Sequence, residues 1–152
     1  MRISAKADYA VRASLELGSR PAGIPTKGTD LASAQEIPLQ FLEQILLELK
    51  RGGLVRSRRG ANGGYWLTRD PAEVTVADVI RAVEGPLANI HELSPEETEY
   101  SGSAERLRDV WIAVRASLRA VLEEVTLADL IAGDLPESIS ALNDEPGAWE
   151  VR

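Results

Sequence analysis

The most constraining feature of this sequence is an amphipathic helix pattern that stops at a glycine pair and leads directly into a β-hairpin pattern. Between residues 38 and 51, apolar side chains recur at three- and four-residue steps, as they do on one buried helix face. The positions on this face are Leu42, Ile45, Leu46 and Leu49. Pro38 suits the first turn of the helix, where its missing N–H is no loss, and Gly52–Gly53 end the helix.

The hairpin that follows carries a concentration of arginine. Residues 54–58 and 64–69 are short alternating segments, typical of β-strands, and the turn between them is rich in glycine and asparagine. Glycine permits the positive φ angles that tight turns require. Because Arg56, Arg58 and Arg59 precede this turn, the sequence predicts a thin, positively charged hairpin tip.

Two more helices are predicted upstream of this pair of patterns. Ser4 can cap a helix that ends near Gly18, and Thr26 can cap a short helix that ends near Gln35. Helix, helix, tight turn, helix and hairpin are the elements of a winged helix-turn-helix. In such a domain one helix fits the major groove of DNA, and arginines on a thin hairpin approach the adjacent minor groove.

Downstream of the hairpin, the pattern changes to helices separated by an acidic stretch. Thr75 and Asp78 have capping-box spacing and begin a helix that Gly85–Pro86 end. Ser103 can then cap a long helix that reaches Val125. Its apolar stripe is too long for the surface of a monomer, so we expect two copies of the chain to pair through it. The expected dimerisation residues are Leu107, Val110, Trp111, Val114, Leu118, Val121, Leu122 and Val125.

The expected fold class is mostly α with a small β-hairpin, divided into four parts. A winged helix-turn-helix domain occupies residues 1–85, and an acidic loop occupies 86–102. A dimerisation helix with a short following helix occupies 103–134. Residues 135–152, which are rich in proline and acidic side chains, are expected to form a flexible tail.

The charge distribution suits a first half that binds a polyanion. Residues 1–69 contain 11 Lys and Arg against 6 Asp and Glu, a net charge of +5, whereas residues 70–152 carry −12. The two halves add to the total of −7. A basic half on an acidic chain indicates binding to nucleic acid. Chance clustering of solvated charges explains the same numbers about as well.

Several kinds of site are excluded by what the sequence lacks. There is no cysteine, which excludes disulfides, thiolate metal sites and a catalytic thiol. The one histidine, His91, lies among acidic residues, and we interpret it as a solvated side chain rather than a metal ligand. We therefore expect no metal, no cofactor and no enzymatic activity. The N-terminus has no cleavage signal and no apolar run could span a bilayer, which predicts a cytoplasmic protein.

Two segments of the chain form a long and ordered signature: "MRISAKADYAVRASLEL" and "FLEQILLELKRGGLVRSRRGANGGYWLTRDPAEVTVADVIRAVEG". They closely resemble the Rrf2 family of bacterial transcription regulators, and the resemblance is continuous over roughly residues 1–86. It implies a homodimer that binds pseudo-palindromic operators on double-stranded DNA, with the long helix of each subunit crossing to its partner. We therefore expect a sequence-specific regulator, and a repressor in particular.

One departure from the family pattern is large. Many Rrf2 regulators carry three cysteines in the loop before the dimer helix and hold an iron–sulfur cluster there, whereas this loop has none. Asp8 stands where some cluster-binding members supply another ligand, but an acid without thiolates cannot hold such a cluster. The resemblance then implies control by a small molecule or a partner protein, and we expect it near Trp111 and the loop after Gly85. An alternative is that binding a metabolic enzyme or another regulator is the main task of the protein.

The residues expected to contact DNA come from the N-terminal segment, the helix after Pro38 and the hairpin. They are Arg2, Lys6, Pro38, Gln40, Phe41, Glu43, Gln44, Lys50, Arg56, Arg58, Arg59, Asn62, Gly63 and Tyr65. Next to a glycine-rich tip, Arg58 and Arg59 favour DNA contact over an ordinary surface position, and Arg59 is the better candidate for the minor groove.

Other members of this set have alternative roles. Gln40 and Gln44 can pair with adenine, but exposed glutamines on helices are common. Glu43 can accept a hydrogen bond from cytosine or repel misplaced phosphates. Phe41 can be a partly exposed core residue or touch a thymine methyl, and Asn62 can be a turn residue only.

Overall fold

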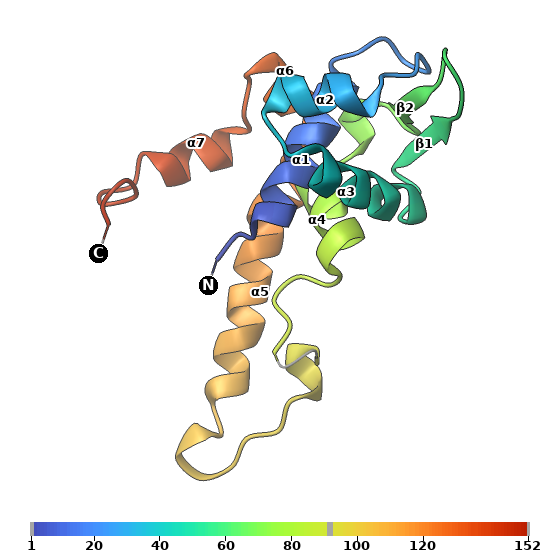
Figure 1. Cartoon of the computed structure of the whole chain (residues 1–152). Coiled ribbons are helices and arrows are strands. Elements are labelled where there is room, and N and C mark those ends of the chain that lie inside the picture. The colour runs from blue at the N-terminus through green and yellow to red at the C-terminus, as the bar shows by residue number, and fades with distance from the viewer. Residues whose placement is uncertain (1, 91–92, 152) are drawn as a thin grey trace.

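The computed structural model describes residues 2–90 and 93–151. The interpretation of His91 therefore lies outside the described residues. The described chain is mostly helical with a two-stranded antiparallel sheet, so the predicted fold class is confirmed (Figure 1). Its helices and strands are α1 (Ala5–Gly18), α2 (Gly28–Gln35), α3 (Leu39–Arg51), β1 (Val55–Arg58), β2 (Gly64–Leu67), α4 (Val76–Glu84), α5 (Leu107–Leu122), α6 (Leu127–Ala132) and α7 (Glu137–Asn143).

The first four helices and the hairpin pack around one core. α1 contacts α2, α3 and α4, and β1 follows α3 onto the same core. The predicted apolar face of α3 is buried, and its four residues are each at most 1% exposed: Leu42, Ile45, Leu46 and Leu49. The chain returns to this unit after α5, because Leu127 of α6 is fully buried and its N–H donates to the carbonyl of Val74.

Most local signals in the sequence act where they were predicted. The hydroxyl of Ser4 accepts a hydrogen bond from the N–H of Ala7 and caps α1. Thr75 and Asp78 form a capping box at the start of α4. α3 ends at Gly52, and Gly53 has a φ of 76° that other residues rarely adopt.

Two predicted helix starts upstream of the hairpin are shifted. Thr26 does not cap α2; the capping position belongs to Lys27, whose side chain makes no capping hydrogen bond. Thr26 instead pairs with Tyr65 of β2 through backbone hydrogen bonds of 2.9 and 2.8 Å. Pairing with the hairpin extends the backbone of Thr26, so the helix begins later. Pro38 likewise lies one residue before α3, at its capping position.

The predicted start of the long helix is wrong. Ser103 lies in a 3-10 turn over Gly102–Ala104, and α5 begins at Leu107. Gly102 has a φ of 59°, which turns the chain and delays the helix. The acidic stretch before it is also more ordered than an aperiodic loop, since a second 3-10 turn, Pro95–Glu97, contacts α5.

The tail contains a helix that the sequence analysis did not predict. α7 begins after Pro136, and Ile139 on it is only 9% exposed. Ser138 donates a hydrogen bond of 2.6 Å to the carboxylate of Glu124, and the indole of Trp149 donates one of 2.8 Å to the carbonyl of Asn143. The contact between Ser138 and Glu124 joins residues 14 positions apart, which is beyond the reach of a local sequence pattern.

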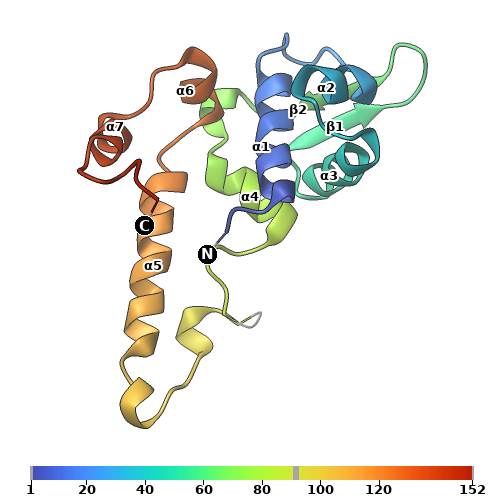
Figure 2. The same ribbon diagram turned by 60° about the vertical axis from the view of Figure 1, so that its left-hand side comes forward.

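α5 projects away from the packed unit, and both views show it extending beyond α4 (Figures 1 and 2). The 3-10 turn Pro95–Glu97 lies along its free half. In the part of the chain that the structure describes, no helix is both long and apolar enough to cross a bilayer.

Candidate nucleic-acid interface

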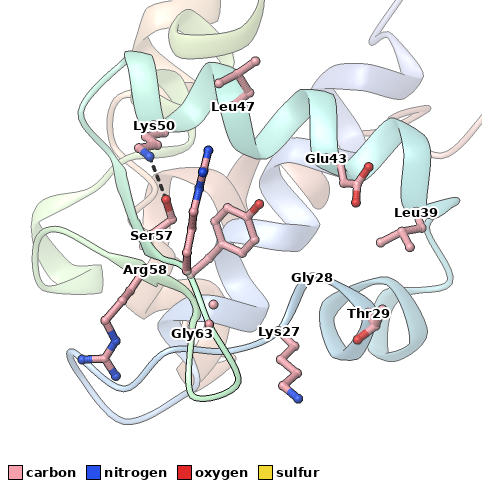
Figure 3. Close-up of a pocket in the computed structure, with 14 residues that line it drawn as sticks. Lys27, Gly28, Thr29, Leu39, Glu43, Leu47, Lys50, Ser57, Arg58 and Gly63 are labelled. Carbon is pink, nitrogen blue, oxygen red and sulfur yellow. Dashed lines mark hydrogen bonds between the residues drawn. The ribbon is translucent and has the colours of Figure 1, made fainter.

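A groove of about 510 Å³ separates α3 from the hairpin, which we call the wing. Its floor and walls come from the start of α2, one side of α3, and both strands and the turn of the wing (Figure 3). The lining residues are Lys27, Gly28, Thr29, Leu39, Glu43, Leu47, Lys50, Ser57, Arg58, Arg59, Gly60, Gly63, Gly64 and Tyr65. Four of the lining side chains are cationic and one is acidic, which gives the groove a net positive charge.

The wing is fixed to α3 by a direct side-chain contact. The ammonium group of Lys50 donates a hydrogen bond of 2.8 Å to the hydroxyl of Ser57 on β1 (Figure 3). β1 and β2 are in antiparallel register, with Val55 opposite Leu67 and Arg58 opposite Gly64. This contact and the ladder set the width of the groove between helix and wing.

The turn of the wing depends on glycine for space. A Cβ on Gly63 would lie 2.1 Å from the carbonyl oxygen of Arg58, and one on Gly64 would lie 2.4 Å from that of Thr26. Both distances are far below van der Waals contact. The guanidinium of Arg58 donates a hydrogen bond of 3.0 Å to the carbonyl of Asn62 across the turn. Gly63, which we predicted as a DNA contact, therefore has a demonstrable structural role.

The predicted contact residues fall into two groups around this groove. Those that line it are Glu43, Lys50, Arg58, Arg59, Gly63 and Tyr65. The others on α3, at its capping position or on the wing are exposed but do not line the groove: Pro38, Gln40, Phe41, Gln44, Arg56 and Asn62. The structure thus brings the six lining residues of helix and hairpin together on one surface, and contact of each predicted residue with DNA remains a prediction.

Two predicted residues lie elsewhere. Lys6 on α1 forms an ion pair of 2.8 Å with Glu48 on the flank of α3, so its ammonium group is already engaged. Arg2 lines a second groove between the N-terminal segment, α4 and α5. Phe41 also has a partner within the domain, since its ring packs edge-on against Tyr9 with ring centroids 6.5 Å apart.

Of the fourteen lining residues, eight were not predicted as contacts, among them Lys27, Leu39 and Leu47. Lys27 lies just before α2 and enters the groove only because Thr26 pairs with the wing. Leu39 and Leu47 are apolar positions outside the buried stripe of α3, and they are 38% and 42% exposed. An apolar residue off the core stripe was the available signal for both leucines.

The carboxylate of Glu16, a partly buried residue of α1, links α1 to α2. Glu16 accepts a hydrogen bond of 3.0 Å from the amide of Gln35 and one of 2.6 Å from the guanidinium of Arg20. The amide hydrogen bond, and then the arginine, hold the pKa of Glu16 below its usual range. Gln35 is the last residue of α2, so this contact fixes the helix that precedes α3.

Comparison with known proteins agrees with this geometry. Residues 3–133 match the family model described as "Rrf2: Iron-dependent Transcriptional regulator". The chain belongs to the Rrf2 family. It is 50% identical over 150 residues to Rv1287 of Mycobacterium tuberculosis, a protein named as an HTH-type transcriptional regulator, and this covers 99% of the chain and 93% of that relative.

Solved structures of Rrf2 proteins share the fold. CymR of Bacillus subtilis, titled a global cysteine regulator, superposes with a TM-score of 0.72 at 34% identity, covering 88% of this chain and 98% of CymR. IscR of T. potens gives a TM-score of 0.70 at 32% identity, covering 88% of each chain. This chain is therefore a winged-helix, DNA-binding transcription regulator rather than an enzyme.

The iron dependence in the Rrf2 description does not fit the ligands of this chain. The chain has no cysteine to supply thiolates. The carboxylate of Asp8 is paired at 3.2 Å with the guanidinium of Arg12. Among the described residues, no group of three or more histidine, cysteine or acidic side chains could hold a metal ion.

The acidic stretch before α5 corresponds in position to the loop that holds a cluster in many Rrf2 regulators. Here contacts within the protein hold this stretch. Ser94 and Glu97 form a capping box around the 3-10 turn Pro95–Glu97, and Pro95 is under 2% exposed. The carboxylate of Glu96 forms an ion pair of 2.5 Å with Arg115 on α5. A backbone hydrogen bond and then Arg115 lower the pKa of Glu96.

Proposed function

We propose that this protein is a homodimeric, sequence-specific repressor that binds a pseudo-palindromic operator in the cytoplasm. The observation that carries the proposal is the cationic groove between α3 and the wing, on a chain whose total charge is −7. Arginine and lysine neutralise phosphates, while the acidic remainder limits contact with other polyanions. α3 then enters the major groove and the wing lies along the adjacent minor groove.

The division of labour within the interface follows from the side chains. Gln40 and Gln44 are exposed on α3 and carry the amide chemistry that pairs with adenine. Glu43 lines the groove, and among the described residues no hydrogen bond or ion pair occupies its carboxylate. It is therefore available to accept a hydrogen bond from the amino group of cytosine. Arg59 extends from the wing toward the minor groove, where the negative potential is strong.

The exposed apolar side chains of α5 support dimerisation through this helix. None of the residues of α5 is buried in the protomer, and Val110 and Ile112 are 52% and 38% exposed. The helix also extends beyond the packed unit, free of other helices along much of its length (Figure 1). A second copy would cover this surface and place two α3 helices on one face of the duplex.

The sensing step has a candidate location beside α5. A second groove of about 420 Å³ lies between the N-terminal segment, α4 and α5, next to the loop after Gly85. Its walls are largely apolar and include Ile80, Leu118 and Leu122, and Arg2 and Glu84 are its charged lining residues. Trp111 is not part of its lining. A small molecule or partner protein that binds here would act only if it favours one dimer geometry over another.

Genome-wide mapping of bound DNA in the source organism tests the proposal. We expect discrete sites that share a pseudo-palindromic sequence, and deletion of the gene should raise transcription of the adjacent genes. The purified protein alone should shift fragments that contain these sites. Binding only in the presence of another protein would instead favour an interaction protein as the main role.

A further inference from the structure

One side of α3 carries apolar side chains that neither the core nor phosphate binding explains. Leu39, Glu43 and Leu47 are spaced four residues apart, so they share one face of the helix, and all three line the groove (Figure 3). We call these three residues the reading strip. Leu39 and Leu47 are 38% and 42% exposed, whereas the leucine and isoleucine side chains on the core face of the same helix are buried.

The residues around the reading strip indicate which chemical group of DNA its leucines contact. The groove is otherwise lined by hydrogen-bonding and cationic groups from the wing and from Lys27 and Lys50. A phosphate or sugar edge gives no reason to place a leucine there. On the edges of base pairs in the major groove, the apolar group is the C5-methyl of thymine, and apolar side chains recognise it by contact.

We propose that Leu47, with Leu39, reads thymine C5-methyl groups on either side of the position that Glu43 faces. This inference rests on the proposed function, because it names the bases that the same interface recognises. At ~1.5 Å of rise per residue, the two leucines are roughly 12 Å apart along α3. At ~3.4 Å per base pair, they span about three to four base pairs. Each half-site therefore contains two thymines at this separation.

The structure favours Leu47 over Phe41 for this contact. Phe41 is exposed, but its ring packs at 76° against Tyr9 and it does not line the groove. Leu47 makes no comparable ring contact and lies one turn from Lys50, which is fixed to the wing. The part of α3 that carries Leu47 is therefore the part whose position relative to the wing is set.

The test uses the full-length protein and a duplex selected by it from random-sequence DNA. Each thymine of the half-site is replaced in turn by deoxyuridine, symmetrically in both halves, which removes only the methyl group. Affinities are measured for the wild type, Leu47→Ala and Leu142→Ala. Leu142 on α7 is 45% exposed and is the matched control.

One thymine should respond to Leu47. For the wild type, deoxyuridine at that position should weaken binding about fourfold per half-site, the equivalent of about 0.8 kcal/mol at 1.4 kcal/mol per factor of ten. Leu47→Ala should bind the thymine duplex about as weakly and lose nothing further on deoxyuridine, while Leu142→Ala behaves as wild type. A penalty that is the same in Leu47→Ala, or absent at every thymine, overturns the inference while leaving DNA binding intact. Failure to select any sequence contradicts the proposed function itself.

Discussion

The two adjacent arginines of the wing, Arg58 and Arg59, have different surroundings, and this difference suggests different roles for them. The guanidinium of Arg58 is bonded across the turn to the carbonyl of Asn62. Arg59 lines the groove, and no hydrogen bond or ion pair within the described residues engages it. Arg58 therefore supports the shape of the tip, and Arg59 is free to enter the minor groove.

Arg59→Ala should weaken operator binding by about 1–3 kcal/mol. The slope of the logarithm of the binding constant against the logarithm of the salt concentration should also fall by about one, as expected for each lost phosphate contact. The physical reason is the loss of a cation from the narrow groove, with no loss of a contact within the protein. Arg69→Ala, an exposed arginine at the far end of the wing, is the matched control. Equal effects of the two substitutions in a fluorescence anisotropy titration would remove the wing tip from the interface.

A second prediction at this scale concerns Glu16 and pH. Its pKa is lowered in the folded protein, so its contribution to the free energy of unfolding is present above the ordinary carboxyl value of 4.5 and is lost as pH falls through the folded pKa. Glu16→Gln should therefore be less stable than the wild type at neutral pH, by about 1 kcal/mol. The difference should shrink below that value in urea titrations at several pH values. A difference that stays constant down to strongly acid pH would contradict the assignment.

At the scale of elements, helices with dense local signals were predictable and those set by distant contacts were not. The stripe of α3 and its glycine stop determine that helix from adjacent residues alone. Thr26 has the side chain of a cap, but pairing with Tyr65 decides its conformation. α7 has a weak local pattern, and the hydrogen bond from Ser138 to Glu124 joins it to an earlier part of the chain.

The candidate interface was predictable to the same extent. Positive charge beside the glycine-rich turn identified Arg58 and Arg59, and positive charge at the end of the helix after Pro38 identified Lys50, because such side chains are rarely buried. Lys27 could not be found, since only the Thr26 bridge brings it to the groove. Lys6 was predicted as a phosphate contact, which remains a prediction; its ion pair with Glu48 could not be predicted, because folding alone brings the two residues together.

The exposed side of α5 gives a prediction about assembly. Val110→Glu should place an unpaired charge in the proposed dimer interface, shift the protein toward monomer and weaken operator binding. Val110 is 52% exposed in the protomer, so the substitution leaves the fold of each subunit intact. It is a cleaner choice than Trp111, whose indole N–H is already enclosed within the protomer.

Val151→Glu makes the same chemical change at a fully exposed position in the tail and serves as the control. Sedimentation equilibrium reports the state of both variants. A Val110→Glu protein that remains a dimer with normal operator affinity would exclude this side of α5 from the interface.

For the whole molecule, the absence of thiolates predicts how it responds to iron and oxygen. Protein prepared without oxygen should be colourless and free of stoichiometric iron, and oxidants should leave its operator affinity unchanged. Iron analysis and visible absorption of the anaerobic preparation check this directly. A stoichiometric cluster would overturn the argument from ligand chemistry and require donors other than cysteine.

The whole molecule combines a cationic binding groove with an acidic remainder, and we propose that this arrangement recognises a DNA sequence. A competition titration of the purified protein between its mapped site and a scrambled duplex of equal length, at physiological salt, tests this. We expect two protomers per site and an affinity for the mapped sequence at least about 10³ times that for the scrambled one. A ratio of affinities near one, with no partner able to raise it, would exclude sequence-specific binding.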